Sequence, residues 1–174
     1  MARVIAIIAL IFILGAVNGS IWQKEQQLAN GRIVYLELAP VDPRSLMQGD
    51  YMALRFAIGN SISSALREQL NSLIQPDKVS DGYVIVKLDD SRVAGFQRLD
   101  TGDPLAANEI RLYYRVRNSK VKFATNAFFF QEGDANLYND ARYGQFRVND
   151  KGEPLLVAMF DKDLSKLGPE QDKD

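Results

Sequence analysis

The stretch EIRLYYRVRNSKVKFATNAFFF, residues 109–130, decides the fold class of this chain. Apolar and polar side chains alternate along residues 109–117, which is the period-two pattern of a strand with one buried face. Asn118 and Ser119 follow as a turn, and residues 120–130 return with β-branched and aromatic side chains. The stretch therefore predicts a long antiparallel hairpin, with the three consecutive phenylalanines at its end contributing to a core.

The flanking sequence repeats this pattern of short segments separated by turns. The predicted segments, in chain order, are strands at residues 33–38, 51–58, 83–88, 93–99, 145–148 and 155–160, and a helix at residues 61–73. The helix places Ile62, Leu66 and Leu70 on one face. Residues 132–141 are predicted to be a loop or a short helix. Short strands at regular intervals with one amphipathic helix indicate a mainly β domain of the α+β class, folded as an antiparallel half-open barrel or sheet.

The amino-terminal segment is an unbroken apolar run over residues 4–17, preceded by Arg3. Fourteen residues suit a signal peptide, but counting on to Trp22 gives nineteen, or roughly 28 Å at about 1.5 Å per residue, which nearly matches the hydrocarbon thickness of a bilayer. Trp22 and Lys24 would then lie at the interface. We expect an uncleaved transmembrane helix, with a signal peptide cleaved after Gly19 as the alternative.

The anchor sets the expected organisation and sidedness of the chain. Arg3 on the short amino-terminal side favours an N-inside orientation, so the domain is expected on the outer face of the membrane. Residues 1–29 are the predicted anchor and its helical extension, residues 30–161 are a β-rich outer-face domain, and residues 162–174 are a charged tail predicted to be disordered.

The composition excludes several classes of active site. The chain has no Cys and no His, which excludes disulfides, thiolate sites and the Ser–His–Asp and Cys–His types of catalysis within it. Its formal net charge of −1 gives no general attraction to nucleic acid. Residues 100–102, Asp-Thr-Gly, are interpreted as a turn rather than an aspartic-protease motif, and the segment beginning at Asp134 lacks the ligands of a calcium loop. No metal and no cofactor are expected.

Residues 42–56, reading DPRSLMQGDYMALRF, carry a signature. The residues that match the pattern GDYxxLxY are Gly49, Asp50, Tyr51 and Leu54, with Phe56 in place of the final Tyr. FFFQEG at residues 128–133 and ARYGQFRV at residues 141–148 look like the second half of the same family. The chain thus resembles the GDYxxLxY family of bacterial membrane-anchored proteins over residues 33–157. This resemblance implies a single-pass outer-face domain, often encoded beside multi-pass membrane proteins, and it implies no activity.

A second resemblance, at the level of the scaffold, is to type I signal peptidases. The shared order is an anchor, a turn ending Gly49-Asp50, and the stretch DGYVIVKL at residues 81–88. Those enzymes use a Ser–Lys dyad, which the absence of His does not exclude. Their nucleophile would fall at Val41 and their lysine at Gly95, so this resemblance implies a shared scaffold without the dyad at these positions.

Two groups of residues are candidate binding sites. The first is a groove between the motif-bearing stretches, made of Arg44, Asp50, Tyr51, Arg142 and Tyr143. We predict that Asp50 and Arg142 are paired there, because an unpaired charge near apolar surface is unfavourable. The second is a basic strand face, which is either solvated or in contact with anionic lipid headgroups or an acidic partner. Its residues are Arg111, Arg115, Arg117, Lys120 and Lys122.

The chain is therefore predicted to be a non-enzymatic interaction module. It would be tethered in the bacterial inner membrane by its amino-terminal helix, with a periplasmic domain and an integral membrane protein as partner. The alternative function is that of a peptidase-type hydrolase on a signal-peptidase-like scaffold with relocated catalytic groups.

Overall fold

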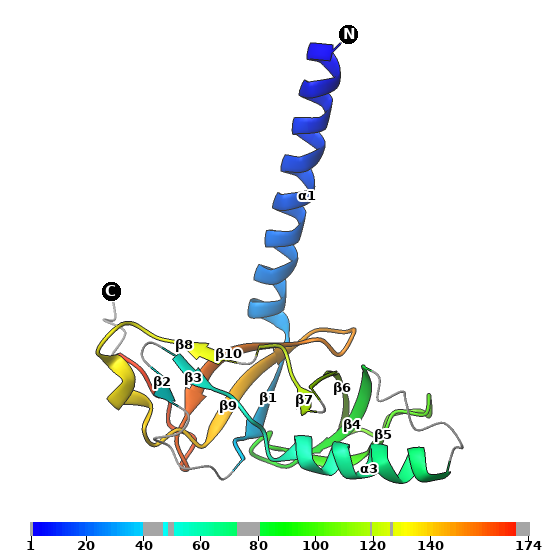
Figure 1. Ribbon diagram of the computed structural model, residues 1–174, viewed down its shortest axis with the longest axis vertical. Coiled ribbons are helices and arrows are strands. Elements are labelled where there is room, and N and C mark those ends of the chain that lie inside the picture. The colour runs from blue at the N-terminus through cyan, green and yellow to red at the C-terminus, as the bar shows by residue number, and fades with distance from the viewer. Residues whose placement is uncertain are drawn as a thin grey trace.

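Figure 1 shows the computed structural model of the chain, in which a long amino-terminal helix stands upright on a β-rich domain. The structure describes residues 2–39, 47–48, 51–72, 81–118, 120–125 and 127–169. Helix α1 spans Ala2–Asn30 and leads directly into the first strand of the domain. The two parts meet where α1 contacts strands β9 and β10, so the helix is docked on the domain.

The elements of the domain follow α1 in a regular succession of short segments. They are β1 (Arg32–Glu37), β2 (Met47–Gln48), β3 (Tyr51–Ala53), α3 (Ile58–Ser72), β4 (Gly82–Leu88), β5 (Ala94–Leu99), β6 (Glu109–Arg117), β7 (Lys120–Lys122), β8 (Ala127–Phe129), the 3-10 helix η1 (Asp134–Tyr138), β9 (Tyr143–Val148) and β10 (Pro154–Phe160).

The strands form antiparallel sheets that curl around one core as a half-open barrel. Within the described part of the chain, the strand orders are β1-β9-β10, β2-β3-β8 and β5-β4-β6-β7. Strand β1 connects these sheets, because Tyr35 bridges to Val93 beside β5 and Leu38 bridges to Phe56 after β3. The predicted fold class, a mainly β antiparallel domain with one amphipathic helix behind an apolar helix, is confirmed.

The core lies between the curled sheets and α3. Alternate residues of β1 and β9, such as Val34 and Phe146, are fully buried, as the period-two pattern predicts. Ile62 of α3 is also fully buried, so the apolar face of the predicted helix is the one that packs on the sheets. Phe56 packs edge-on against Phe123 and Phe146, with ring centroids 6.2 and 5.3 Å apart. This aromatic cluster joins segments that are distant in the sequence.

Both shorter predicted hairpins are confirmed. Strands β4 and β5 pair antiparallel, and so do β9 and β10. The turn between β9 and β10 also reaches β6, since the Gly152 carbonyl accepts a hydrogen bond from the Tyr113 amide at 2.7 Å. Gly152 has a φ of 79°, and a Cβ there would lie 2.7 Å from the Arg111 carbonyl oxygen, so this turn requires glycine.

The prediction of one strand over residues 51–58 is wrong beyond Ala53. Strand β3 ends there, and α3 begins at Ile58, three residues before the predicted start of the helix. The Gly59 amide donates to the Phe56 carbonyl, and the Asn60 amide donates to that of Ala57. Ile58 is buried one turn before Ile62, so packing against the core extends the helix towards the amino terminus.

The long return strand predicted at residues 120–130 is divided between two sheets. Strand β7 pairs with β6 only as far as Lys122, and β8 pairs with β3 instead. Phe123 is buried in the core between them, and Ala124 has a φ of 45°, in the left-handed region that turns the chain. The pull of the Phe123 ring into the core thus outweighs continuation of the hairpin.

The carboxyl-terminal segment begins with a turn that packs back on the domain. The Leu167 amide donates to the Met159 carbonyl at 2.8 Å, and Phe160 bridges to Lys166. Leu167 also packs against the core. The charged tail predicted from residue 162 therefore starts with a docked turn, and residues 170–174 lie outside the described part.

Helix α1 is long and apolar enough over Arg3–Asn30 to cross a membrane, a test that a signal sequence at this position also passes. Its most apolar window has no part buried against the domain. A continuous exposed apolar surface is unfavourable in water, so the segment is compatible with membrane anchoring.

Candidate functional site

The end of the motif at residues 49–56 serves the core. Leu54 and Phe56 are each 7% exposed, and both belong to the central apolar cluster. Tyr51 is half-buried in β3, with its ring 5.8 Å from that of Phe129 in β8. Gly49 and Asp50 lie outside the described residues. The described part of the motif is therefore a packing signature.

Arg142, from the second motif-bearing stretch, has a partner that the sequence did not suggest. Its Nη2 lies 3.0 Å from Oε1 of Glu37, with both side chains partly exposed. The register places Glu37 of β1 directly opposite Tyr143 of β9, which brings these charges together. The predicted partner Asp50 and the groove residue Arg44 fall outside the described residues, so the groove hypothesis stays a prediction.

An aromatic cluster surrounds the 3-10 helix η1. The ring of Tyr138 contacts those of Phe128 and Phe130, with centroids 5.1 and 5.3 Å apart, while Phe129 between them is 72% exposed. The three phenylalanines thus divide between the core and the surface, as strand alternation requires. Burial of Tyr138, assisted by the nearby Asp134 carboxylate, raises the pKa of its hydroxyl.

Two residues of the predicted basic face are neutralised by carboxylates. Arg111 Nε lies 2.7 Å from Asp100 Oδ2, and its guanidinium also stands over the ring of Tyr83. Arg117 forms a two-pronged pair with Asp81, at 2.6 Å to Oδ1 and 2.8 Å to Oδ2. Arg117 and the Val116 amide hold the pKa of Asp81 down at about 2. These pairs reduce the positive potential of the β6 face.

The remaining residues of the predicted face behave differently. The Arg115 guanidinium donates to the Ala124 carbonyl at 2.5 Å, which ties it to the turn after β7. Lys120 and Lys122 lie opposite Arg117 and Arg115 in the antiparallel register, so they continue the same face as predicted. Within the described part of the chain neither lysine has a carboxylate partner.

One ion pair that the sequence analysis missed joins β5 to β6. Arg98 lies 2.6 Å from Glu109, whose side chain is 9% exposed. The Glu109 carboxylate also accepts from the Ala106 amide, and the Arg98 guanidinium followed by this amide lowers the pKa of Glu109. The available signal in the sequence was an acidic residue at the start of an otherwise basic strand face, but its partner depends on the pairing of β4 with both neighbours.

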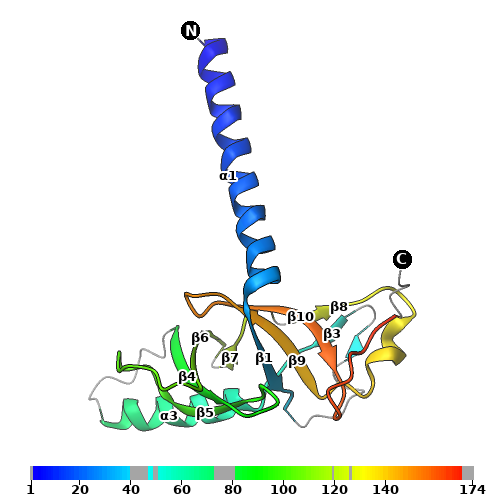
Figure 2. The same cartoon turned by 180° about the vertical axis from the view of Figure 1, so that it is seen from behind.

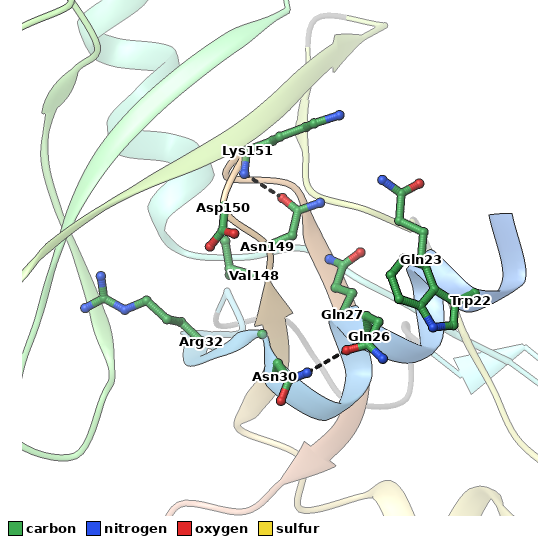
Figure 3. Close-up of a pocket in the computed structure, with 11 residues that line it drawn as sticks. Trp22, Gln23, Gln26, Gln27, Asn30, Arg32, Val148, Asn149, Asp150 and Lys151 are labelled. Carbon is green, nitrogen blue, oxygen red and sulfur yellow. Dashed lines mark hydrogen bonds between the residues drawn. The ribbon is translucent and has the colours of Figure 1, made fainter. Parts of the chain in front are cut away.

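Figure 3 shows a surface cavity of about 420 Å³ where α1 meets the turn between β9 and β10. Gln23 and Gln27 point from α1 towards that turn, which carries Asn149 and Lys151. Trp22 of α1, which is 63% exposed, lines the same cavity on the side formed by the helix. The lining is rich in amide groups, but those of Gln27 and Asn149 are already hydrogen-bonded within the domain. The amide of Gln23, which has no side-chain hydrogen bond among the described residues, is the one placed to pair with a peptide backbone.

The junction beside this cavity is fastened by Gln27. Its side chain is 5% exposed and donates to the carbonyl oxygens of Arg147 and Glu153, at 3.0 and 2.8 Å. Arg147 in turn donates to the Gly31 carbonyl at 3.0 Å. A Cβ at Gly31 would lie 2.5 Å from the Gln27 carbonyl oxygen of α1 itself, and 3.1 and 3.2 Å from the Arg147 Cβ and the Val148 carbonyl oxygen of β9, so the chain can pass from helix to sheet this closely only with glycine there. The helix end is therefore part of the folded domain.

Among the described residues, no group of three or more Asp and Glu side chains is placed to hold a metal ion. The position at which a signal peptidase would carry its lysine is Gly95, in β5, which has no side chain to offer. The position of the nucleophile, Val41, lies outside the described residues.

A family model described as "GDYXXLXY protein" matches residues 13–159 of this chain. No curated protein and no solved structure matches this chain. The family resemblance seen in the motifs is thus supported over most of the chain, and the scaffold resemblance to signal peptidases has no support from these comparisons.

Proposed function

Since this chain belongs to the GDYXXLXY family, we propose that it acts as a membrane-tethered interaction module that works with an integral membrane protein. In this proposal α1 stays attached as a single-pass anchor in the bacterial inner membrane. The domain then lies in the periplasm, because Arg3 precedes the apolar run.

The observation that carries the proposal is the docking of α1 through Gln27. One uninterrupted helix contains both the apolar segment and the docked turn. A flexible linker would let the domain move freely relative to the membrane, whereas this junction fixes the distance between the domain and the apolar segment of α1. Trp22, eight residues before the end of the helix and thus about 12 Å from that end along the helix axis, would lie at the interface.

The cavity beside the junction supports the choice of partner. It opens between Trp22 and the turn at residues 149–151, close to where an apolar span would end. An extramembrane segment that emerges beside α1 would meet the Gln23 amide, which has no side-chain hydrogen bond among the described residues and could pair with its backbone. Soluble periplasmic proteins would have to approach the same cavity along the membrane surface, so a neighbour already in the bilayer is favoured.

Site-specific photo-crosslinking in intact membranes tests the proposal. A crosslinker at Gln23, which lines the cavity, is expected to capture one integral membrane protein. The matched control is a crosslinker at Glu68, an exposed position of α3 on the other side of the domain. Equal capture from both positions, or capture only of soluble proteins from Gln23, would contradict the proposal.

A further inference from the structure

A second cavity, of about 640 Å³, lies between α3, the segment after β3, and β7. Its lining includes four basic side chains from three separate elements, namely Arg55, Arg67, Lys120 and Lys122. The described residues that line it include no Asp and no Glu. This is a local charge of four in a chain whose net charge is −1.

Several other cations of the domain have carboxylate partners, whereas these four are gathered at one cavity without any among the described residues. Arg98, Arg111, Arg117 and Arg142 each pair with a carboxylate. Across the described residues, none of the four cations at the cavity has an ion pair or a side-chain hydrogen bond. Like charges gathered around one cavity repel one another, and a bound anion would relieve that repulsion.

The cavity also supplies neutral donors from the α3 face that carries Arg67, since Asn60, Ser63 and Ser64 recur there at helical spacing and line the cavity. The Ser63 hydroxyl donates to the Gly59 carbonyl at 2.8 Å, which leaves the side chains of Asn60 and Ser64 as the donors. This polar face is next to the apolar face that carries Ile62 into the core. The first turn of α3 has no acidic residue, so the positive end of the helix dipole adds to the potential there.

We propose that this cavity is a binding site for a phosphate-type oxyanion carried by a small molecule or a headgroup. Two arginines offer planar forks that match phosphate oxygens, and two lysines add compact charges. Clustered cations favour a multiply charged anion over a single carboxylate. This inference is independent of the proposed function, because it concerns a different cavity and needs no membrane partner.

The position of the site indicates which source of phosphate it meets. Helix α3 lies on the side of the domain opposite α1 in both views (Figures 1 and 2). Headgroups of the membrane that holds α1 would therefore be on the far side of the domain. A soluble phosphate ester, or the headgroup of a second membrane surface, can reach it.

The test uses the full chain in nanodiscs of zwitterionic lipid, with pyrophosphate as the probe. Pyrophosphate is expected to raise the thermal unfolding temperature in a saturable way that weakens with added salt. The double variant Lys120→Gln/Lys122→Gln should bind it roughly tenfold more weakly per cation removed. The matched control, Lys87→Gln/Lys166→Gln, removes two exposed lysines that line neither cavity and should bind like the parent chain.

Two further arms separate the source of phosphate from a structural role. Anionic vesicles added to the nanodiscs identify a headgroup ligand. In that case the protein should bind the vesicles but not pyrophosphate, and vesicle binding should require Lys120 and Lys122. Without any anion, the Lys120→Gln/Lys122→Gln variant should be at least as stable as the parent, because repulsion is removed. Equal weakening in both double variants, or no binding of either probe to the parent chain, would overturn the proposal.

Discussion

Leu54 and Phe56 show how a sequence signature can report packing rather than chemistry. Both side chains are buried, and the Phe56 ring meets rings from two other segments, at Phe123 and Phe146. Neighbouring residues of the same motif-bearing stretch face elsewhere, with Arg55 exposed at the second cavity. Alternation along the chain thus divides one motif between the core and the surface.

Replacement of Phe56 by Ala is expected to lower the free energy of unfolding by about 3–5 kcal/mol, because it removes an aromatic ring from a packed core and leaves a cavity. Chemical denaturation of the full chain in detergent measures the effect. Phe129→Ala is the matched control, since that ring is 72% exposed, and it should cost far less. Equal losses in the two variants would contradict the core assignment of the motif.

The titration of Asp81 should make the stability of the domain depend on pH. Its pKa falls from 3.8 to about 2, chiefly through Arg117 and then through the Val116 amide. A folded-state pKa below the unfolded value means that the ionised carboxylate favours folding. The stabilisation is complete above about pH 4 and is lost as the pH falls towards 2.

We therefore expect Asp81→Asn to be less stable than the parent chain at pH 7 and to differ little from it near pH 2. Unfolding midpoints measured across this range test the expectation. Asp90→Asn, an exposed residue of the turn between β4 and β5, is the control and should leave the profile unchanged. A constant difference between Asp81→Asn and the parent at every pH would show that the charge of Asp81 is not the cause.

At the scale of elements, α1 has two different environments along its length. Its apolar part is bare, whereas its last turn is fastened to β9 and β10 through Gln27. Two hydrogen bonds from one buried amide are enough to define where the helix ends on the sheet. The docking of α1 can therefore be tested by replacing Gln27 alone.

Gln27→Met keeps the size of the side chain and removes its two hydrogen bonds to the domain, along with the one it accepts from Lys24, which should weaken the docking by about 1–3 kcal/mol. Limited digestion with trypsin after Arg32 reports the opening of the junction, and its rate should rise about tenfold or more. Gln23→Met is the control, because Gln23 is exposed and its side chain has no hydrogen bond among the described residues. Faster digestion of the control variant to the same extent would contradict the role of Gln27.

At the scale of the whole molecule, we expect α1 to stay attached. The apolar surface of the helix would be unfavourable in water, and the helix continues without a break past Gly19, the cleavage point of the signal-peptide alternative. A cleaved chain would begin at Ser20 and would keep the docked turn without the apolar part.

The intact mass of the protein extracted from membranes is expected to include residues 1–19. A mass that begins at Ser20 would show that the apolar part is a signal peptide. Orientation can be tested in the same preparation, because the chain lacks Cys and a single introduced one can be labelled selectively. Glu68→Cys should react with an impermeant maleimide from the outer face, whereas Ala2→Cys should not.

The sequence by itself determined the features that depend on local spacing. Apolar continuity predicted α1, and alternation predicted the strands at β1 and β6. Short segments bounded by turn residues predicted β4, β5, β9 and β10, and the absence of His and Cys excluded whole classes of catalysis. These follow from the side-chain periods of the helix and the strand, which each segment carries within itself. The family motifs were likewise readable as a linear pattern.

Only the tertiary structure decided which segments meet. It paired β1 with β9, moved β8 to β3, and placed Asp81 and Asp100 against arginines that had been read as one basic face. It also joined Arg55 and Arg67 to Lys120 and Lys122 around one cavity. Such contacts span many residues, and they are selected by the register and burial of the whole core, where competing pairings look alike to any local segment.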